Sequence, residues 1–446
     1  MCNSKARGHR EISRFQLAQR LPKISLAEKA VPLYISALSI YESSFQLNDT
    51  IYQFGVIRQA REGPNPETIE MQNLEGGCPQ DIDRFGFRKR SLPDQTRQDV
   101  FDLECRKARL MITHRQLIAL ERERMELKNV PENLEEEDLV DPHQLDIRIR
   151  NQGPNSRDER LEGLNESIRY LKLGLEIEEL DVQCYQCKRD NRPSPFDMFI
   201  QLTKTSPDGT DYIERFNYDK SLKEARKYLI CKLFENRQLV TKIKSLRFWG
   251  LPHDEIVSSR PEGIKFDVQE FTTSGNLSEV LPRVETILEH PNRPFTSLSL
   301  NEWKLEDAQN PKVRSAEVLV LNNNNIRFAD CVALCREVPN KKIKINSDLY
   351  IHPDQFGLLV ENLIDTKGTL GTYHEITRIR EEDEARDALR FIAERFENAV
   401  VGERLVTIPL PSELQLVVSY EPYQFNSSIL MYTIKMEVVQ SQNNLK

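Results

Sequence analysis

The sequence predicts a mixed α+β or α/β protein in which a small β region, a long helical hairpin and a strand–helix domain follow one another. Three observations support this prediction. Apolar residues alternate with a period of two between Leu33 and Ile57, two segments within 97–183 repeat leucine every seven residues, and strand-sized apolar runs alternate with helical ones after Pro195. With 39% hydrophobic and 30% charged residues, the chain has the composition of a soluble globular protein.

The first ninety-five residues are expected to form a helical segment, two strands and a loop. Residues 10–30 carry helically spaced apolar side chains, and Pro22 interrupts them. Between Leu33 and Ile57 the alternation predicts two strands, joined by a turn at Asn48-Asp49. Residues 60–95 are rich in Gly, Pro and Asn, so they predict a loop, with one short strand near Ile69.

Two long amphipathic helices are predicted within 97–183. The apolar residues of both helices recur at intervals of three, four or seven, which is the spacing of one helix face. They are Leu103, Leu110, Leu117, Leu120 and Leu127 in the first, and Leu161, Leu164, Ile168, Leu171, Leu175 and Val182 in the second.

An acidic connection at 131–155 separates these two helices and lets the chain turn back on itself. We therefore expect an antiparallel helical hairpin and a monomeric protein. A pair of amphipathic helices lying separately on a neighbouring domain fits the same pattern.

From Pro195 onward the chain is predicted to be α/β. Expected strands lie at 196–202, 212–216, 243–248, 266–272, 295–300, 316–321, 342–345 and 372–376, and expected helices at 221–234, 276–288, 326–337, 354–365 and 382–396. Successive strand–helix steps of about 20–30 residues are typical of leucine-rich-repeat-like units.

The repeat signature itself is degenerate. Leu298-x-Leu300-x-x-Trp303 and Leu319-x-Leu321-x-x-Asn324 resemble the strand-and-corner part of such a repeat, and an ordinary mixed sheet is the alternative. Strands at 405–408, 414–420 and 430–438 are expected to close the domain. The predicted domains are 1–32, 33–95, 96–190 and 191–440.

No motif in the sequence predicts a catalytic, cofactor or metal site. Cys184-x-x-Cys187 has no second ligand pair, and Cys331 and Cys335 share one face of a predicted helix, which is typical of buried thiols. The seven histidines lack ligand spacing, and the chain has no glycine-rich phosphate loop. We therefore expect neither an enzyme nor a bound cofactor or metal, and nothing supports a surface-thiol enzyme using Cys187.

Charge and hydropathy suggest where the protein acts. The formal net charge is −8, which disfavours nucleic acid and anionic membranes as partners. No run of apolar residues approaches the ~20 needed to span a bilayer, and the polar start lacks the apolar core of a signal peptide. The eight cysteines are scattered through the chain, as in intracellular proteins. We expect a cytoplasmic protein, with the nucleus as an alternative.

Several blocks of sequence resemble one protein family. Residues 187–248, beginning CKRDNRPSPFDMFIQLTKT, resemble a domain of unknown function expanded in Caenorhabditis nematodes. Supporting blocks lie before and after this segment, in the order in which the family has them. They are found at 21–40, 48–59, 66–77, 261–268, 310–321 and 410–421.

This resemblance implies relatives among F-box-associated proteins, in which an N-terminal F-box recruits a Skp1-like adaptor and a C-terminal repeat-like domain binds a target. Residues 10–32 are long enough for only part of an F-box, with Leu21-Pro22 in place of its opening pair. The candidate adaptor-binding residues are Phe15, Leu17, Leu21 and Pro22.

The resulting hypothesis is a non-enzymatic protein–protein interaction protein that serves a cullin-type ubiquitin ligase as a substrate-recruiting adaptor. The alternative is a scaffolding protein that self-associates through its helical region.

Overall fold

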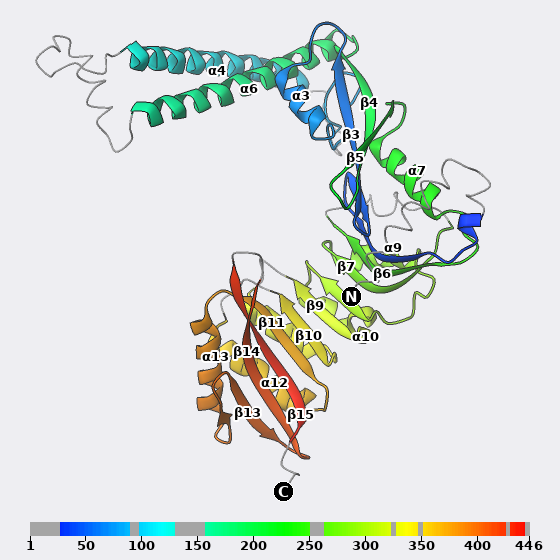
Figure 1. Ribbon diagram of the computed structural model, residues 1–446, viewed down its shortest axis with the longest axis vertical. Coiled ribbons are helices and arrows are strands. Elements are labelled where there is room, and N and C mark those ends of the chain that lie inside the picture. Colours follow the sequence, from blue (N-terminus) through cyan, green and yellow to red (C-terminus); the bar gives the residue numbers. More distant parts are fainter. Residues whose placement is uncertain are drawn as a thin grey trace, which may run out of the picture. The chain divides into compact units, whose positions relative to one another are not determined.

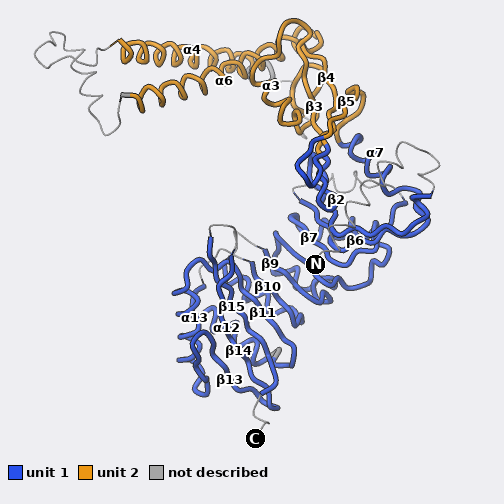
Figure 2. Tube along the Cα trace, viewed as in Figure 1, with its two compact units in different colours: residues 1–52, 204–211, 223–446 blue, residues 53–203, 212–222 orange. Residues whose placement is uncertain are grey.

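The structure is a computed structural model that describes residues 27–89, 98–129, 157–249, 263–322, 327–346, 351–424 and 429–441. It divides into two compact units, coloured separately in Figure 2. Unit 1 takes residues up to 52, 204–211 and those from 223 onward. Unit 2 takes residues 53–203 and 212–222.

Unit 1 is an α/β domain whose helices alternate with strands. Its strands are β1 (Tyr34–Ile40), β2 (Ser44–Leu47), β6 (Thr241–Phe248), β7 (Phe266–Thr273), β8 (Ser297–Leu300), β9 (Val318–Asn322), β10 (Lys342–Asn346), β11 (Tyr373–Ile379), β12 (Val400–Val401), β13 (Leu405–Leu410), β14 (Leu414–Gln424) and β15 (Leu430–Gln440). Its helices are α7 (Leu222–Phe234), α9 (Leu277–Glu285), the 3₁₀ helix η2 (Leu305–Gln309), α10 (Pro311–Ser315), α11 (Phe328–Glu337), α12 (Pro353–Lys367) and α13 (Glu382–Arg395).

The strands of unit 1 follow a simple order. From β6 to β11 each strand pairs in parallel with the next strand in the sequence, and β1 pairs in parallel with β6 at the start of this run. Strand β15 then pairs antiparallel with β11, and β14, β13 and β12 follow it outward. Strands β3, β4 and β5 continue the order beyond β2, which gives one sheet of fifteen strands among the described residues.

One face of the parallel sheet is buried under the helices (Figure 1). On β8, β9 and β10 a fully buried Leu or Ile alternates with a side chain that keeps some exposure, as Leu298 and Leu300 do on β8. Helices α11, α12 and α13 pack against one another in series on the buried side. This alternation is the expected pattern for a sheet with one covered face.

Two arginines fix peripheral segments to unit 1. Arg226 of α7 is almost completely buried and donates hydrogen bonds to the carbonyl oxygens of Tyr41, at 2.7 Å, and of Glu42, both of which follow β1. Arg237 forms a buried ion pair with Glu28, whose side chain is 4% exposed. The first contact fastens the segment between β1 and β2 to α7, and the second fastens residues near the start of the described chain to the loop that follows α7.

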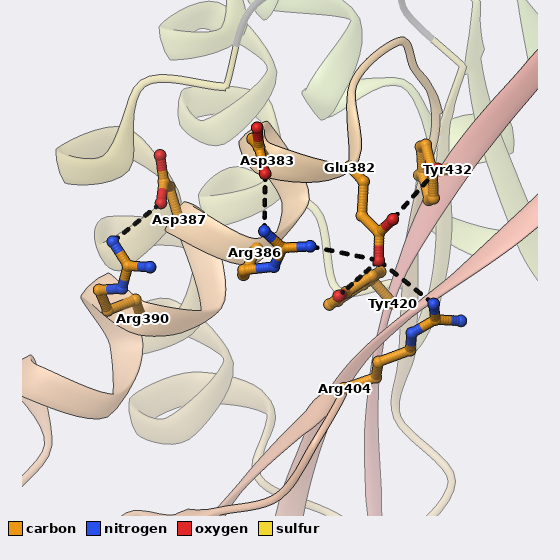
Figure 3. A network of polar contacts seen from close by, with 8 residues as sticks. All are labelled: Glu382, Asp383, Arg386, Asp387, Arg390, Arg404, Tyr420 and Tyr432. Atoms are coloured by element: carbon orange, nitrogen blue, oxygen red, sulfur yellow. Dashed lines mark hydrogen bonds and ion pairs between the residues drawn. The ribbon is translucent and has the colours of Figure 1, made fainter.

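A polar cluster joins α13 to the closing strands (Figure 3). The Glu382 carboxylate accepts hydrogen bonds from the hydroxyl of Tyr420 at 3.0 Å, from Arg404 at 3.2 Å and from the hydroxyl of Tyr432 at 3.4 Å. The hydrogen bond from Tyr420 lowers the pKa of Glu382, and so do the positive charges of Arg404 and Arg386. Because Glu382 lies in the first turn of α13, its charge is also favoured by the helix dipole.

Unit 2 combines strands with a long helical hairpin. It contains most of β3 (Thr50–Ala60), then α3 (Glu67–Leu74), α4 (Gln98–Asn129), α6 (Arg157–Arg189), most of β4 (Phe196–Thr205) and most of β5 (Asp211–Asn217).

Helices α4 and α6 lie side by side and antiparallel. Their ion pairs join Arg106 to Asp181, Glu121 to Lys172, and Glu123 to Arg160, so residue numbers rise along one helix as they fall along the other. The core of the hairpin contains apolar residues of both predicted stripes, namely Leu110, Leu117, Leu120, Ile168, Leu171 and Leu175. The prediction of an antiparallel hairpin is therefore confirmed.

One local prediction was wrong. The short strand expected near Ile69 is part of helix α3, and Ile69 packs against Leu180 and Phe196. Pro66 precedes the helix, and Glu67 and Glu70 place negative charge in its first turn, which are both typical of a helix start. The other predicted strands and helices of the described chain are present. β2, β12, η2 and α10 were missed, because only two strands were predicted between Leu33 and Ile57 where the structure has three.

Candidate functional site

The uncovered side of the parallel sheet carries three rows of side chains across β8, β9, β10 and β11. We call these twelve residues the open face: Ser297, Ser299, Asn301, Val318, Val320, Asn322, Lys342, Lys344, Asn346, Tyr373, Glu375 and Thr377. They alternate along each strand with the buried residues or directly follow them, and each keeps intermediate or full exposure. Because successive strand residues point to opposite sides, they share the side away from the helices.

Strand register places the rows directly across the sheet. In the first row Ser297 pairs with Val318, which pairs with Lys342. In the second, Val320 lies between Ser299 and Lys344. Each row continues onto β11, so polar, apolar and charged side chains lie together on one side of the sheet.

The third row is a ladder of side-chain amides. Asn322 Nδ2 donates to Ser299 Oγ at 2.6 Å and to Asn301 Oδ1 at 2.8 Å. Asn346 Nδ2 donates to Asn322 Oδ1 at 2.7 Å, and Thr377 Oγ1 donates to Asn346 Oδ1, also at 2.7 Å. The hydrogen bonds run in one direction across four strands, which fixes the orientation of every amide in the row.

A charged group occupies the β10–β11 end of the open face. Lys344 Nζ lies 2.8 Å from Glu375 Oε2, and the hydroxyl of Tyr373 donates to the same oxygen at 3.0 Å. Burial and the neighbouring Glu375 raise the pKa of Tyr373, so it remains a protonated donor at neutral pH. The Glu375 side chain is 13% exposed and the Lys344 side chain is 43% exposed, so the lysine is the more accessible partner.

A short repeat in the sequence encodes the β8, β9 and β10 part of this face, and the sequence motifs considered above do not include it. The segments SLSLN (297–301), VLVLN (318–322) and KIKIN (342–346) each place two buried aliphatic residues between open-face residues and end in asparagine. The expected corner residue Asn324 lies outside the described residues, and the asparagines that form the ladder directly follow the second aliphatic residue. Matching asparagines across the three segments would have revealed the ladder.

The predicted adaptor-binding residues Phe15, Leu17, Leu21 and Pro22 all lie outside the described residues. The cysteines singled out in the sequence are described. Cys184 and Cys187 are buried on α6, and Cys331 and Cys335 are buried on α11. Burial raises the pKa of both Cys184 and Cys331 to about 12, so these thiols are protonated at neutral pH.

Within the described residues, no three His, Cys, Asp or Glu side chains are grouped as metal ligands would be. No helix in the same part of the chain combines the length and apolar character needed to cross a bilayer.

Comparison with protein families gives a match on the part of unit 1 that carries the open face. Residues 221–379 match the family model of a domain of unknown function, DUF3557. This DUF3557 domain extends from α7 to β11 and so includes every strand of the parallel run except β1. All twelve open-face residues lie within it. No curated protein and no solved structure matches the chain.

Proposed function

We propose that this protein is a non-enzymatic protein-binding protein that contacts its target through the open face of the DUF3557 domain. The observation that carries the proposal is the composition and order of that face. Val318, Val320 and Tyr373 offer apolar contact area, Lys342 and Lys344 offer accessible charge, and the amide ladder holds the surface rigid. Mixed apolar and charged surfaces that need little reordering suit protein recognition.

We further propose that the parallel run is a leucine-rich-repeat-like array. Its strands are in sequence order, its helices share one face, and its open-face segments recur about every 20–30 residues, within or near the range of such repeats. Arrays of this kind bind partners on the surfaces that successive repeats build together. The recurrence of Asn at one position in three successive segments, as Asn301, Asn322 and Asn346, agrees with this interpretation.

The resemblance to nematode F-box-associated proteins suggests the complex in which the protein acts. In this proposal the open face binds a target protein, and residues 10–32 dock a Skp1-like adaptor of a cullin-type ubiquitin ligase in the cytoplasm. The two parts of the proposal are separable, because target binding does not require the adaptor.

The target-binding part is tested by affinity capture with matched variants of the full chain. Val320→Arg places a long cation at the centre of the open face, whereas Leu370→Arg makes the same kind of change at an exposed residue outside it. We expect a set of proteins that wild type and Leu370→Arg both retain and that Val320→Arg loses, with unchanged circular dichroism. If Val320→Arg retains every protein that wild type retains, the open face is not the binding surface.

The adaptor part is tested separately with a purified Skp1-like adaptor. Leu21→Asp places a charge among the candidate anchors, and truncating such an anchor typically costs ~2 kcal/mol or more of binding free energy. We expect wild type to bind the adaptor and Leu21→Asp to lose that binding at an unchanged melting temperature. Absence of wild-type binding would exclude the adaptor role and leave the open-face proposal intact.

A further inference from the structure

Helix α4 carries a second line of side chains at coiled-coil spacing, and it is separate from the one that packs in the hairpin. Met111, Arg115, Ile118, Arg122 and Met125 succeed one another in steps of four and three residues. We call these five residues the outer seam. They lie beside the Leu110–Leu117 stripe but turned away from it, because consecutive residues differ by about 100° around a helix.

The outer seam is exposed. Met111, Ile118 and Met125 expose 59%, 49% and 57% of their surface, although each is large and apolar. Single exposed apolar residues are common, but three at heptad spacing form a continuous strip suited to another helix. The hairpin buries its own core elsewhere, so the strip is not needed to hold α4 against α6.

The two arginines define the chemistry of the occupant. Arg115 and Arg122 are exposed, and neither has an acidic partner among the described residues. Two carboxylates near the seam are engaged elsewhere, since Glu104 pairs with Lys107 and Glu121 with Lys172. A helix docked on this strip would gain most by presenting carboxylates to the two guanidinium groups, which bind them in a bidentate manner.

A second copy of α4 fits the outer seam poorly. In a parallel pair each arginine would face its own counterpart, and in an antiparallel pair it would face Met or Ile. Neither arrangement neutralises the two positive charges. Like charges at the centre of a helical interface oppose association.

From this spacing and charge we propose that the outer seam binds an amphipathic helix of another protein, one that places apolar residues against Met111, Ile118 and Met125 and carboxylates against Arg115 and Arg122. This surface lies in unit 2 and is independent of the open face. It gives the chain a second protein-binding surface. The outer seam recognises a single helix, whereas the open face would recognise the surface of a folded protein.

The test uses a fluorescent synthetic peptide of three heptads, with Leu opposite the apolar seam residues and Glu opposite the arginines. A second peptide with Lys in place of Glu is its control. We expect full-length protein to raise the fluorescence anisotropy of the Glu peptide only. Ile118→Glu and the double variant Arg115→Glu/Arg122→Glu should each weaken that binding at least 10-fold, and the double variant should now bind the Lys peptide.

A matched control is Tyr170→Glu, which makes an apolar-to-acidic change at a residue of α6 that is 73% exposed and outside the seam. It should leave binding unchanged. Binding of both peptides equally, or of neither, would overturn the proposal. So would a chain dimer that Ile118→Glu dissociates, or binding to phosphatidylserine vesicles through the same residues without peptide binding.

Discussion

The ammonium group of Lys344 and the carboxylate of Glu375 face each other across neighbouring parallel strands, with Nζ 2.8 Å from Oε2. Reversing either charge alone places like charges opposite each other, which should lower the free energy of unfolding by roughly 0.5–1 kcal/mol. The exchange of both, Lys344→Glu with Glu375→Lys, should recover most of that loss in urea unfolding. Additive losses in the double variant would mean that the two groups are not coupled.

The amide ladder should be a source of stability for the DUF3557 domain. Asn322 both donates to Asn301 and accepts from Asn346, so Asn322→Ala removes the middle of the ladder. We expect a loss of about 1–3 kcal/mol in the free energy of unfolding, because half-buried amides are left without partners. Ser297→Ala, on the same face but outside the ladder, is the control and should change stability far less.

The buried pair of Glu28 and Arg237 should be strongly destabilised when one partner is removed. Arg237→Ala leaves a carboxylate that is 4% exposed without its counter-ion, at an expected cost of ~3–5 kcal/mol. Replacing both partners with apolar residues, as in Glu28→Leu/Arg237→Met, should be less damaging than the single change. A single variant as stable as wild type in thermal unfolding would show that the pair is not buried in solution.

Acid should weaken the contact between helix α3 and helix α6. The Glu176 carboxylate accepts hydrogen bonds from the backbone N–H groups of Glu67 and Thr68, at 2.8 and 2.7 Å. Burial alone would raise the pKa of Glu176, but the hydrogen bonds from Thr68 and Glu67 outweigh it and the pKa is lowered.

Because the folded-state pKa is below the unfolded one, this contact stabilises α3 fully above about pH 5 and loses its effect as the pH falls through the folded pKa. Hydrogen exchange of the α3 amides should therefore accelerate at pH 3 relative to pH 6, after correction for intrinsic rates. Glu176→Gln should show the faster exchange already at pH 6. Equal protection of wild type at both pH values would contradict this assignment.

Much of this architecture was predictable because its periodicity is strong. The leucine stripes of the hairpin identify both helices and their packing, and the strand–helix alternation after Pro195 identifies the parallel run. Ile69 was misassigned because the apolar residues around it, Met71 and Leu74, do not follow a helical spacing from it. Its burial depends on Leu180 and Phe196, which are far away in the sequence.

The functional surfaces were harder to predict for a different reason. Open-face residues such as Val320 and Lys344 resemble ordinary solvent-facing strand residues until the register of four strands is known. The outer seam has the same difficulty, because Met111 and Ile118 adjoin Leu110 and Leu117 in the sequence and are easily counted with the hairpin core. Only the structure separates the two stripes.

The pairing of β1 with β6 has a consequence for how the chain matures. Strand β1 ends at Ile40 and β6 begins at Thr241, so about 200 residues must be synthesised before the partner of β1 exists. At translation rates of ~5–20 residues per second, this delay is on the order of 10–40 s. During that time one edge of a strand rich in apolar residues has no β6 beside it, while the hairpin of unit 2 emerges and can fold. We therefore expect that this protein most needs a chaperone before Thr241 has been synthesised, and that nascent chains stalled there bind one.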